Sequence, residues 1–495
     1  MINKVLFLSA SLFFLSLQGC GTDNSPEATV APISVTWAVD SVSRTDGFLT
    51  HVTLTIDNQG EDTLFNRGWT IYYSHLMGAP KAASLPRSVS IENVTGDFQR
   101  LAPTPDFSPL PPQTSRSFSL RYAGFPMRKS YAPHGMYIVF DGKKPRLMAD
   151  LIIEGINVEV LHFLSLTSPS DRYEENALSG ERELLIPRPA QFEKLEGPAF
   201  TFEAHQAVFY EEGLKEEAQF LRAQLRRFFD MEIRLQDIPG AAVKLILEKG
   251  ENNPEAYRLS VKEDDITIAG SDLPGLFYGI QSFLQMMAAQ SIQLGRRDTF
   301  FLPPIRIEDR PRFGYRGLHL DVSRNFHSLE KVKSILDLMA FYKLNKFHFT
   351  LTNDEGWRLE IPGLPELTEV GAFRGHTTDE HEHLYPAYGS GPFSDPDLSY
   401  GSGYYSREEY IELLRYAAER HIEIIPEIDV PGHARAAIIA MRARYRALMA
   451  QGDKEGAEYY RLDDPADTSR YRSAQNYRDN VICVCRESAF RFMGT

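Results

Sequence analysis

The sequence predicts a multidomain chain, with an N-terminal β-sandwich, an α+β middle domain and a C-terminal region of alternating strands and helices. Three observations predict this order. Short alternating segments separated by turn clusters fill residues 32–165, mixed helix and strand patterns fill 184–309, and strand–helix pairs fill 312–495. The length of 495 residues also exceeds that of one ordinary domain.

Composition places the chain among globular proteins and narrows its partners. Hydrophobic residues make up 43% and charged residues 24% of the sequence, which is typical of packed domains. The formal net charge is −14, whereas a protein that binds nucleic acid needs a basic surface for the phosphates. We therefore expect no nucleic-acid partner.

The N-terminus resembles a bacterial lipoprotein signal over residues 1–20. Lys4 precedes an apolar run that is too short to span a bilayer comfortably, and Gln18-Gly19 leads into Cys20. Cys20 would then carry the lipid, and the polar residues 21–31 would form a flexible tether. The alternative is a simple secretory signal in which Cys20 is incidental. The first interpretation predicts a cell-envelope protein, facing the periplasm or on the outer membrane, that touches the membrane only through its lipid.

The other two cysteines, Cys483 and Cys485, are too sparse for a disulfide framework. They also lack histidine or cysteine partners at the spacing of a zinc site. We expect both to be small buried hydrophobes in an extended segment.

Residues 32–165 are typical of a β-sandwich. Segments such as "HVTLTIDN", "WTIYYS" and "GMYIVF" alternate between apolar and polar residues, and clusters such as "NQGEDT" separate them. Trp69, Tyr72 and Tyr73 would form either a sugar-stacking surface or part of the core. The core is the more common place for aromatic residues on strands.

Residues 184–309 combine helices with strands. Apolar residues recur at helical spacing in "GLKEEAQFLRAQLRRFF" and in "SDLPGLFYGIQSFLQMMAA", which begins with a capping pair. Between them, "AYRLSVKEDDITIAG" predicts two strands with a turn from Glu263 to Asp265. This middle domain has no evident chemistry of its own.

The C-terminal region begins with the pattern strand, helix, strand, helix, strand. The strands are "GLHLDVS", "KFHFTLT" and "IEIIPEIDV", and Ser328 and Ser406 are placed to cap the two helices. Alternating β/α units predict a parallel sheet covered by helices.

Each of these strands ends in polar residues, within 321–324, 353–355 and 427–433. Polar side chains at strand carboxyl ends are typical of the active face of a (β/α)8 TIM barrel. The loop from Asn353 to Tyr405 is about fifty residues long, a length that favours pocket construction.

Three long motifs carry a family resemblance. "YRGLHLDVSRNF", "KFHFTLTNDEGWRLEIPGLPELTEVGAFRG" and "IEIIPEIDVPGHARAA" resemble family 20 glycoside hydrolases, the β-N-acetylhexosaminidases and chitobiases. The sandwich is similar to the N-terminal carbohydrate-binding-type domain of bacterial chitobiases. The middle domain, opening with "LLIPRPAQFEKLEG", looks like the domain that precedes the family barrel.

The resemblance implies the removal of terminal β-linked N-acetylglucosamine or N-acetylgalactosamine from a glycan, with retention. In this family the acetamido oxygen of the sugar attacks the anomeric carbon, and a glutamic acid protonates the leaving oxygen. The aspartate just before that glutamic acid orients the acetamido group. Because the nucleophile belongs to the substrate, the resemblance implies no metal and no organic cofactor.

The resemblance also implies roles for four substrate-binding residues. Arg316 matches the arginine that clamps the hydroxyls of the terminal sugar, unless it simply binds a strand-end carboxylate. His433 matches a histidine that pairs with an acidic residue of the second motif. That motif commonly carries two aspartates, whereas this chain has Asn353-Asp354, so only Asp354 keeps a charge. Which of the two meets His433 stays open.

Three further residues have two interpretations each. Trp357 would pack beneath the site or stack on sugar, and packing is favoured. Glu427 and Asp429 would line the floor of the pocket or bond neighbouring strands.

The Asp-Glu pair that supplies the family's general acid, in an "HxGGDE"-like segment, has no match after His433. A TIM barrel needs about 250 residues, more than 312–495 provide. We therefore expect an incomplete barrel, a truncated reading of a longer enzyme, and no activity from this chain itself. A short protein that has lost catalysis is the other explanation.

The sequence thus predicts a lipid-anchored exo-β-N-acetylhexosaminidase that lacks its general acid here. The alternative, from another class, is a non-catalytic glycan-binding lipoprotein. A barrel hydrolase for other β-linked sugars is a third possibility.

Overall fold

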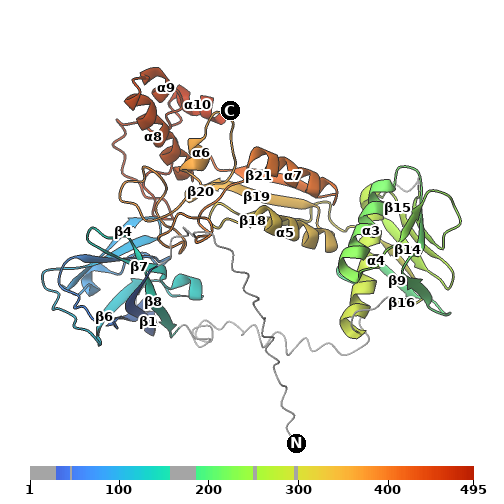
Figure 1. Ribbon diagram of the computed structural model, residues 1–495, viewed down its shortest axis with the longest axis horizontal. Coiled ribbons are helices and arrows are strands. Elements are labelled where there is room, and N and C mark those ends of the chain that lie inside the picture. Colours follow the sequence, from blue (N-terminus) through green and yellow to red (C-terminus); the bar gives the residue numbers. More distant parts are fainter. Residues whose placement is uncertain (1–28, 45–46, 127, 156–184, 249–252, 295–298) are drawn as a thin grey trace, which may run out of the picture.

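The computed structural model describes residues 29–44, 47–126, 128–155, 185–248, 253–294 and 299–495. The expected signal with Cys20, and the tether up to residue 28, lie outside the described residues. Figure 1 shows three units, namely a blue sandwich, a green middle domain and a yellow-to-red C-terminal region. In the part of the chain that the structure describes, no helix has the length and apolar character needed to cross a bilayer.

The N-terminal sandwich is one eight-stranded sheet, in the order β4-β5-β3-β7-β8-β1-β2-β6, whose two halves share a core. Trp37 and Val52 from one half meet Ile71 and Tyr73 from the other in this core. Trp69 is also buried in this core, as the core interpretation predicts for it and for Tyr73. Tyr72 lies outside the core, half-buried, with its ring against Tyr137 and against His376 of the C-terminal region. The strands are β1 (Val30–Arg44), β2 (Phe48–Asn58), β3 (Trp69–Ser74), β4 (Val89–Thr95), β5 (Phe98–Pro103), β6 (Thr114–Ala123), β7 (His134–Phe140) and β8 (Arg146–Glu154).

The middle domain packs two helices on a seven-stranded sheet of order β12-β11-β13-β15-β14-β17-β9, beside a β10-β16 pair. The predicted turn at 263–265 joins β14 and β15. The strands are β9 (Gln191–Lys194), β10 (Phe200–Glu203), β11 (Ala207–Tyr210), β12 (Arg234–Gln236), β13 (Val243–Leu247), β14 (Tyr257–Val261), β15 (Ile266–Gly270), β16 (Thr299–Leu302) and β17 (Ile305–Asp309), and the helices are α3 (Lys215–Phe229) and α4 (Leu273–Leu294).

The C-terminal region, residues 313–495, contains the three predicted parallel strands, with β19 between β18 and β21. Both predicted caps are present, because Ser328 accepts the Lys331 amide and Ser406 forms a capping box with Glu409. The elements are β18 (Gly317–Asp321), α5 (Leu329–Phe341), β19 (Lys346–Asn353), β20 (Gly356–Trp357), α6 (Glu366–Glu369), α7 (Arg407–Ala418), β21 (Glu423–Ile428), α8 (Arg435–Ala450), α9 (Lys454–Tyr459) and α10 (Glu487–Met493).

The two faces of this parallel sheet differ. Phe347, Phe349 and Leu351 of β19 join the core that α5 and α7 complete, and that core runs on into the middle domain. The opposite face carries His319 and His348, as strand alternation requires. The apolar face therefore fixes which side chains the polar face presents.

A buried arginine ties the strand ends to the long loop that follows β19. Arg358 is fully buried, and its five N–H groups donate to five backbone carbonyls. Burial lowers the pKa of this guanidinium to about 9. The five acceptors offset that cost, because no donor is left unpaired. They belong to Val322, Ser323, Ala372, Gly401 and Gly403.

The segment after β21 differs from the sequence-based expectation. Within the described residues it forms α8, α9 and α10 and adds no further strand to the sheet. Cys485 is exposed in a surface turn before α10, and Cys483 directly precedes that turn and is half-buried. The expectation of two buried cysteines in an extended segment is therefore wrong.

Candidate functional site

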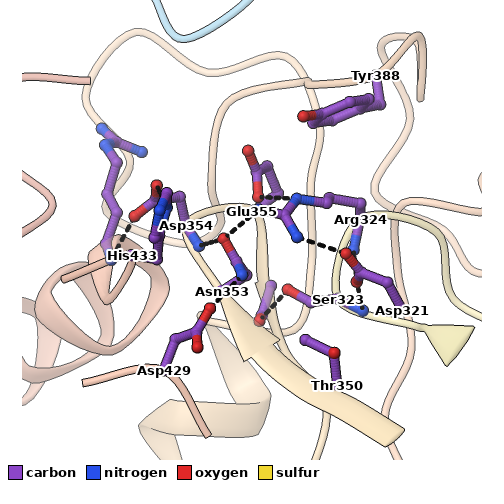
Figure 2. Close-up of polar contacts among 12 residues, drawn as sticks. Asp321, Ser323, Arg324, Thr350, Asn353, Asp354, Glu355, Tyr388, Asp429 and His433 are labelled. Carbon is purple, nitrogen blue, oxygen red and sulfur yellow. Dashed lines mark hydrogen bonds and ion pairs between the residues drawn. The ribbon is translucent and has the colours of Figure 1, made fainter. Parts of the chain in front are cut away.

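The carboxyl ends of β18, β19 and β21 bring together most of the predicted polar residues, as Figure 2 shows. The Nδ1 atom of His433 lies 3.0 Å from Oδ2 of the buried Asp354 carboxylate. A carboxylate only accepts hydrogen bonds, so Nδ1 carries the hydrogen and Nε2 is left for a ligand. The His433 side chain is 44% exposed. The structure thus identifies Asp354, rather than Asn353, as the acidic partner of His433.

Asn353 has a different role, which needs an amide. Its Oδ1 accepts from Nη2 of Arg324 at 2.7 Å, and its Nδ2 donates to Oδ2 of Asp429 at 2.6 Å. An aspartate could not donate to Asp429. Asn353 therefore links a cation on one side to a carboxylate on the other.

Arg324 is the guanidinium of this site. It follows β18, donates to Oδ2 of Asp321 at 2.5 Å, and lies with Nε 3.3 Å from Oε2 of Glu355. Burial alone lowers the pKa of Arg324, but the facing carboxylates of Glu355 and Asp321 outweigh it and raise the pKa above its usual range. The group keeps its charge and its planar set of donors, which suits neighbouring sugar hydroxyls.

Glu355 is a second buried carboxyl of the cluster, beside Asp354. It is fully buried, accepts from the Tyr477 hydroxyl at 2.9 Å and faces Arg324. Burial, opposed in part by Arg324, raises the pKa of Glu355 to about 7. A carboxyl with this pKa changes protonation near neutral pH.

Asp429 directly follows the carboxyl end of β21, whereas Glu427 belongs to the strand itself. Asp429 reaches the site, where burial and the Glu427 charge raise its pKa, while His433 and Arg324 act in the opposite direction. Glu427 lies within the strand, where it accepts from the Thr350 hydroxyl and pairs with the His348 ring of β19. Of the two roles left open, Asp429 therefore lines the site and Glu427 bonds neighbouring strands.

Arg316 does not lie with the other predicted residues, so this expectation is wrong. It precedes β18, and its guanidinium holds Glu255 of the middle domain at 3.0 and 3.1 Å. Five strand residues separate it from the carboxyl end, or about 16 Å. Side chains at the amino end of a parallel strand cannot reach a site at its other end. Arg324, in the same motif, is the arginine that lies at the carboxyl end, in contact with Asn353.

Trp357 packs beneath the site, as favoured. It is buried against Phe492, and its Nε1 donates to the Leu359 carbonyl. The sequence places Glu355 at a strand end but gives it no role of its own, and it does not point to Tyr388 or Tyr477. These tyrosines come from loops that no strand pattern predicts.

Sequence comparisons identify the family of each domain. The family model for the glycosyl hydrolase family 20 catalytic domain matches residues 313–495, and the model for domain 2 of that family matches 183–310. The chain belongs to glycoside hydrolase family 20. A model of a carbohydrate binding domain matches residues 41–176, within and just beyond the described sandwich. The three-domain architecture of family 20 is therefore present.

Relatives of this family 20 chain are hexosaminidases. N,N'-diacetylchitobiase of Vibrio harveyi is 35% identical over 468 residues, which cover 89% of this chain and 50% of the relative. A beta-hexosaminidase of Vibrio vulnificus is 34% identical over 476 residues, covering 89% of this chain and 53% of that protein. The chain spans about half the length of these curated relatives.

A solved structure extends the likeness to the fold. The family 20 exo β-N-acetylglucosaminidase of Vibrio harveyi, in complex with N-acetylglucosamine, superposes with a TM-score of 0.70 at 28% identity. The match covers 94% of this chain and 65% of that one. The likeness to this family 20 structure therefore extends over most of the chain.

Replacement of Asn353 by aspartate should destabilise the site in a pH-dependent way. Asn353→Asp places a second carboxylate against Asp429, and like charges raise both pKa values in the folded state. The folded state then binds more protons than the unfolded one, so stability falls as pH rises. We expect a loss of about 1–3 kcal/mol in urea unfolding at pH 7 and a smaller loss at pH 4. Equal losses at both pH values, or a loss shared by the exposed control Asn66→Asp, would contradict this.

The raised pKa of Glu355 predicts a second pH effect. Between its ordinary value of 4.5 and the folded value of about 7, the folded state holds the extra proton, so ionising Glu355 destabilises the wild type as pH rises. The Glu355→Gln variant cannot ionise at this position, so its stability lacks this pH dependence. From pH 4.5 to pH 8, the wild type should lose up to about 3 kcal/mol more than the variant in urea unfolding. Parallel curves for the two proteins would disprove the assignment, and the exposed Glu382→Gln should follow the wild type.

Proposed function

We propose that this chain recognises the terminal N-acetylhexosamine of a glycan, as the sugar-binding portion of an exo-β-N-acetylhexosaminidase. One observation carries the proposal, namely the Asp354–His433 pair at the strand ends beside Arg324 and Asp429. It occurs in a family 20 chain at the position of the family motif. The relatives that carry hexosaminidase names support the same substrate class.

The side chains offer complementary contacts to a neutral sugar. Arg324 supplies fixed donors for hydroxyls, and the carboxylates of Asp321 and Asp429 supply acceptors. The exposed Nε2 of His433 adds a polar contact, whose orientation the buried Asp354 fixes. Paired donors and acceptors of this kind distinguish a polyhydroxylated ring from an apolar ligand.

The reaction that we propose for the whole enzyme is substrate-assisted hydrolysis with retention. The acetamido oxygen would attack the anomeric carbon while a glutamic acid protonates the leaving oxygen. The Asp-Glu pair expected for this step has no match among the 495 residues of the sequence. We therefore propose that this chain binds the amino sugar without turning it over.

Binding and turnover can be measured separately. Isothermal titration calorimetry should detect N-acetylglucosamine binding, and His433→Ala and Arg324→Met should each weaken it about tenfold or more, because a hydrogen bond to a charged group contributes about 1.5–3 kcal/mol. His51→Ala in the sandwich is the matched control. Glucose, which lacks the acetamido group, should bind more weakly. Equal affinity for glucose would favour the hydrolase for other β-linked sugars.

Hydrolysis of an aryl N-acetylglucosaminide by this chain should be negligible. Robust turnover would mean that a carboxylate within the sequence acts as the acid, and would overturn the proposed absence of a proton donor.

We further propose that the protein is anchored in the cell envelope through a lipid on Cys20. The apolar run before Gly19-Cys20 supports this. In cells fed labelled palmitate, the wild type and the control Cys483→Ser should incorporate label, whereas Cys20→Ser should not. An unlabelled wild type would contradict the anchor.

A further inference from the structure

The turn between β4 and β5 of the sandwich meets the C-terminal region beside the candidate site. Figure 1 shows β4 at the end of the sandwich that faces the loops of that region. Two residues, Gly96 and Asp97, form the turn. Each touches a different tyrosine of the C-terminal region, and both tyrosines lie at the charged cluster of the site.

Asp97 holds the backbone of Tyr388. Asp97 is only 7% exposed, and its Oδ2 accepts from the Tyr388 amide at 3.0 Å. Tyr388 has a left-handed φ of 50°, an unfavourable backbone for a bulky residue that its surroundings must maintain. Its ring lies beside Arg324 and Glu355, as Figure 2 shows. Asp97 therefore fixes a residue that borders the guanidinium of the site.

Gly96 packs against the ring of Tyr477. A Cβ atom at Gly96 would lie 2.5 Å from the ring Cζ and 2.6 Å from the hydroxyl oxygen. That hydroxyl donates to Oε1 of Glu355 at 2.9 Å. The close approach requires glycine, because any side chain would push the ring away from the carboxyl that it serves.

The same turn borders a small shared cavity. It measures about 120 Å³ and is lined by Leu76 and Asp97 of the sandwich together with Glu355, Tyr388, Gln475 and Tyr477. Asp97 Oδ1 and Gln475 Oε1 are buried there without a partner among the described residues. The sandwich therefore forms part of the wall around the buried carboxyl of the site.

Further contacts fix the loop that carries Tyr388 on the sandwich. The Tyr137 hydroxyl lies 3.0 Å from Nδ1 of His376, and a Cβ at Gly389 would lie 2.1 Å from the His134 ring. With contacts before and after Tyr388, the loop has little freedom to shift relative to the sandwich.

We propose that Gly96 and Asp97 are positioning residues for the amino-sugar site, holding Tyr477 and Tyr388 against Glu355 and Arg324. The inference rests on the proposed function, since it gives the sandwich a part in the same sugar contact. Neither residue touches the sugar. They act by fixing the positions of Arg324 and Glu355. This matters because the hydrogen-bonding groups of a site must be held to within about 0.5 Å of their binding geometry.

The test compares two substitutions at Asp97 in the full chain. Asp97→Ala removes the acceptor for the Tyr388 amide, whereas Asp97→Asn keeps one through its side-chain oxygen. We expect Asp97→Ala to weaken N-acetylglucosamine binding about tenfold in calorimetry, equivalent to about 1.4 kcal/mol. Asp97→Asn should stay within about twofold of the wild type. Wild-type affinity for a folded Asp97→Ala would overturn the inference.

Gly96→Ala provides an independent perturbation with a matched control. It should weaken sugar binding like Asp97→Ala, because its methyl group displaces Tyr477. Gly142→Ala adds the same methyl group at a left-handed glycine of the sandwich with no atom within 4 Å, and should bind normally. Loss of binding in both glycine variants would indicate general damage to the sandwich and overturn the inference. If Gly96→Ala does not fold, the comparison of Asp97→Ala with Asp97→Asn tests the inference without it.

Amide hydrogen exchange separates this inference from the proposed function. In Asp97→Ala, exchange in residues 353–357 should be faster than in the wild type and in Asp97→Asn. If the wild type binds no N-acetylglucosamine, the proposed function fails. Faster exchange at 353–357 would then still support positioning by the turn, and unchanged exchange would overturn it.

Discussion

The buried carboxylate of Asp354 is the interaction on which the candidate site depends. It accepts from Nδ1 of His433, from the Arg435 amide and from the side chain of Asn480, which belong to segments far from β19. A buried charge without partners costs several kcal/mol, so these donors are required for the fold as well as for the site. By gathering them, Asp354 brings the chain after β21 over the end of β19 and orients the exposed imidazole.

Parallel register supplies the rest of the arrangement. Because β18, β19 and β21 run the same way, Arg324, Asn353 and Asp429 leave their strands at the same edge, where an amide links the cation to the carboxylate. The buried Arg358 holds the loop after β19 against that edge. The sandwich completes the support from the other side, through the turn at Gly96 and Asp97. In this view it is a structural part of the site as well as a candidate carbohydrate-binding domain.

Sequence patterns predicted the elements and much of the site, but not every contact. Ser328 and Ser406 were identifiable as caps because capping is local, and Asp354 and His433 because they follow strands in long motifs. Motif resemblance pointed to Arg316, although Arg324 is the arginine that follows the carboxyl end of the strand. Tyr388 and Tyr477 could not be predicted, since their places depend on packing against a distant sandwich turn. The exposure of Cys485 follows from a turn, where the sequence predicts an extended segment.

The most direct test is a crystal structure of this chain soaked with N-acetylglucosamine. The account predicts a single pyranose at the strand ends, with ring hydroxyls about 3 Å from the Arg324 guanidinium and from the carboxylate of Asp429. The Asp354–His433 pair should remain intact beside it. Sugar bound only on the sandwich, or bound elsewhere while these side chains face bare solvent, would contradict the assignment of the site.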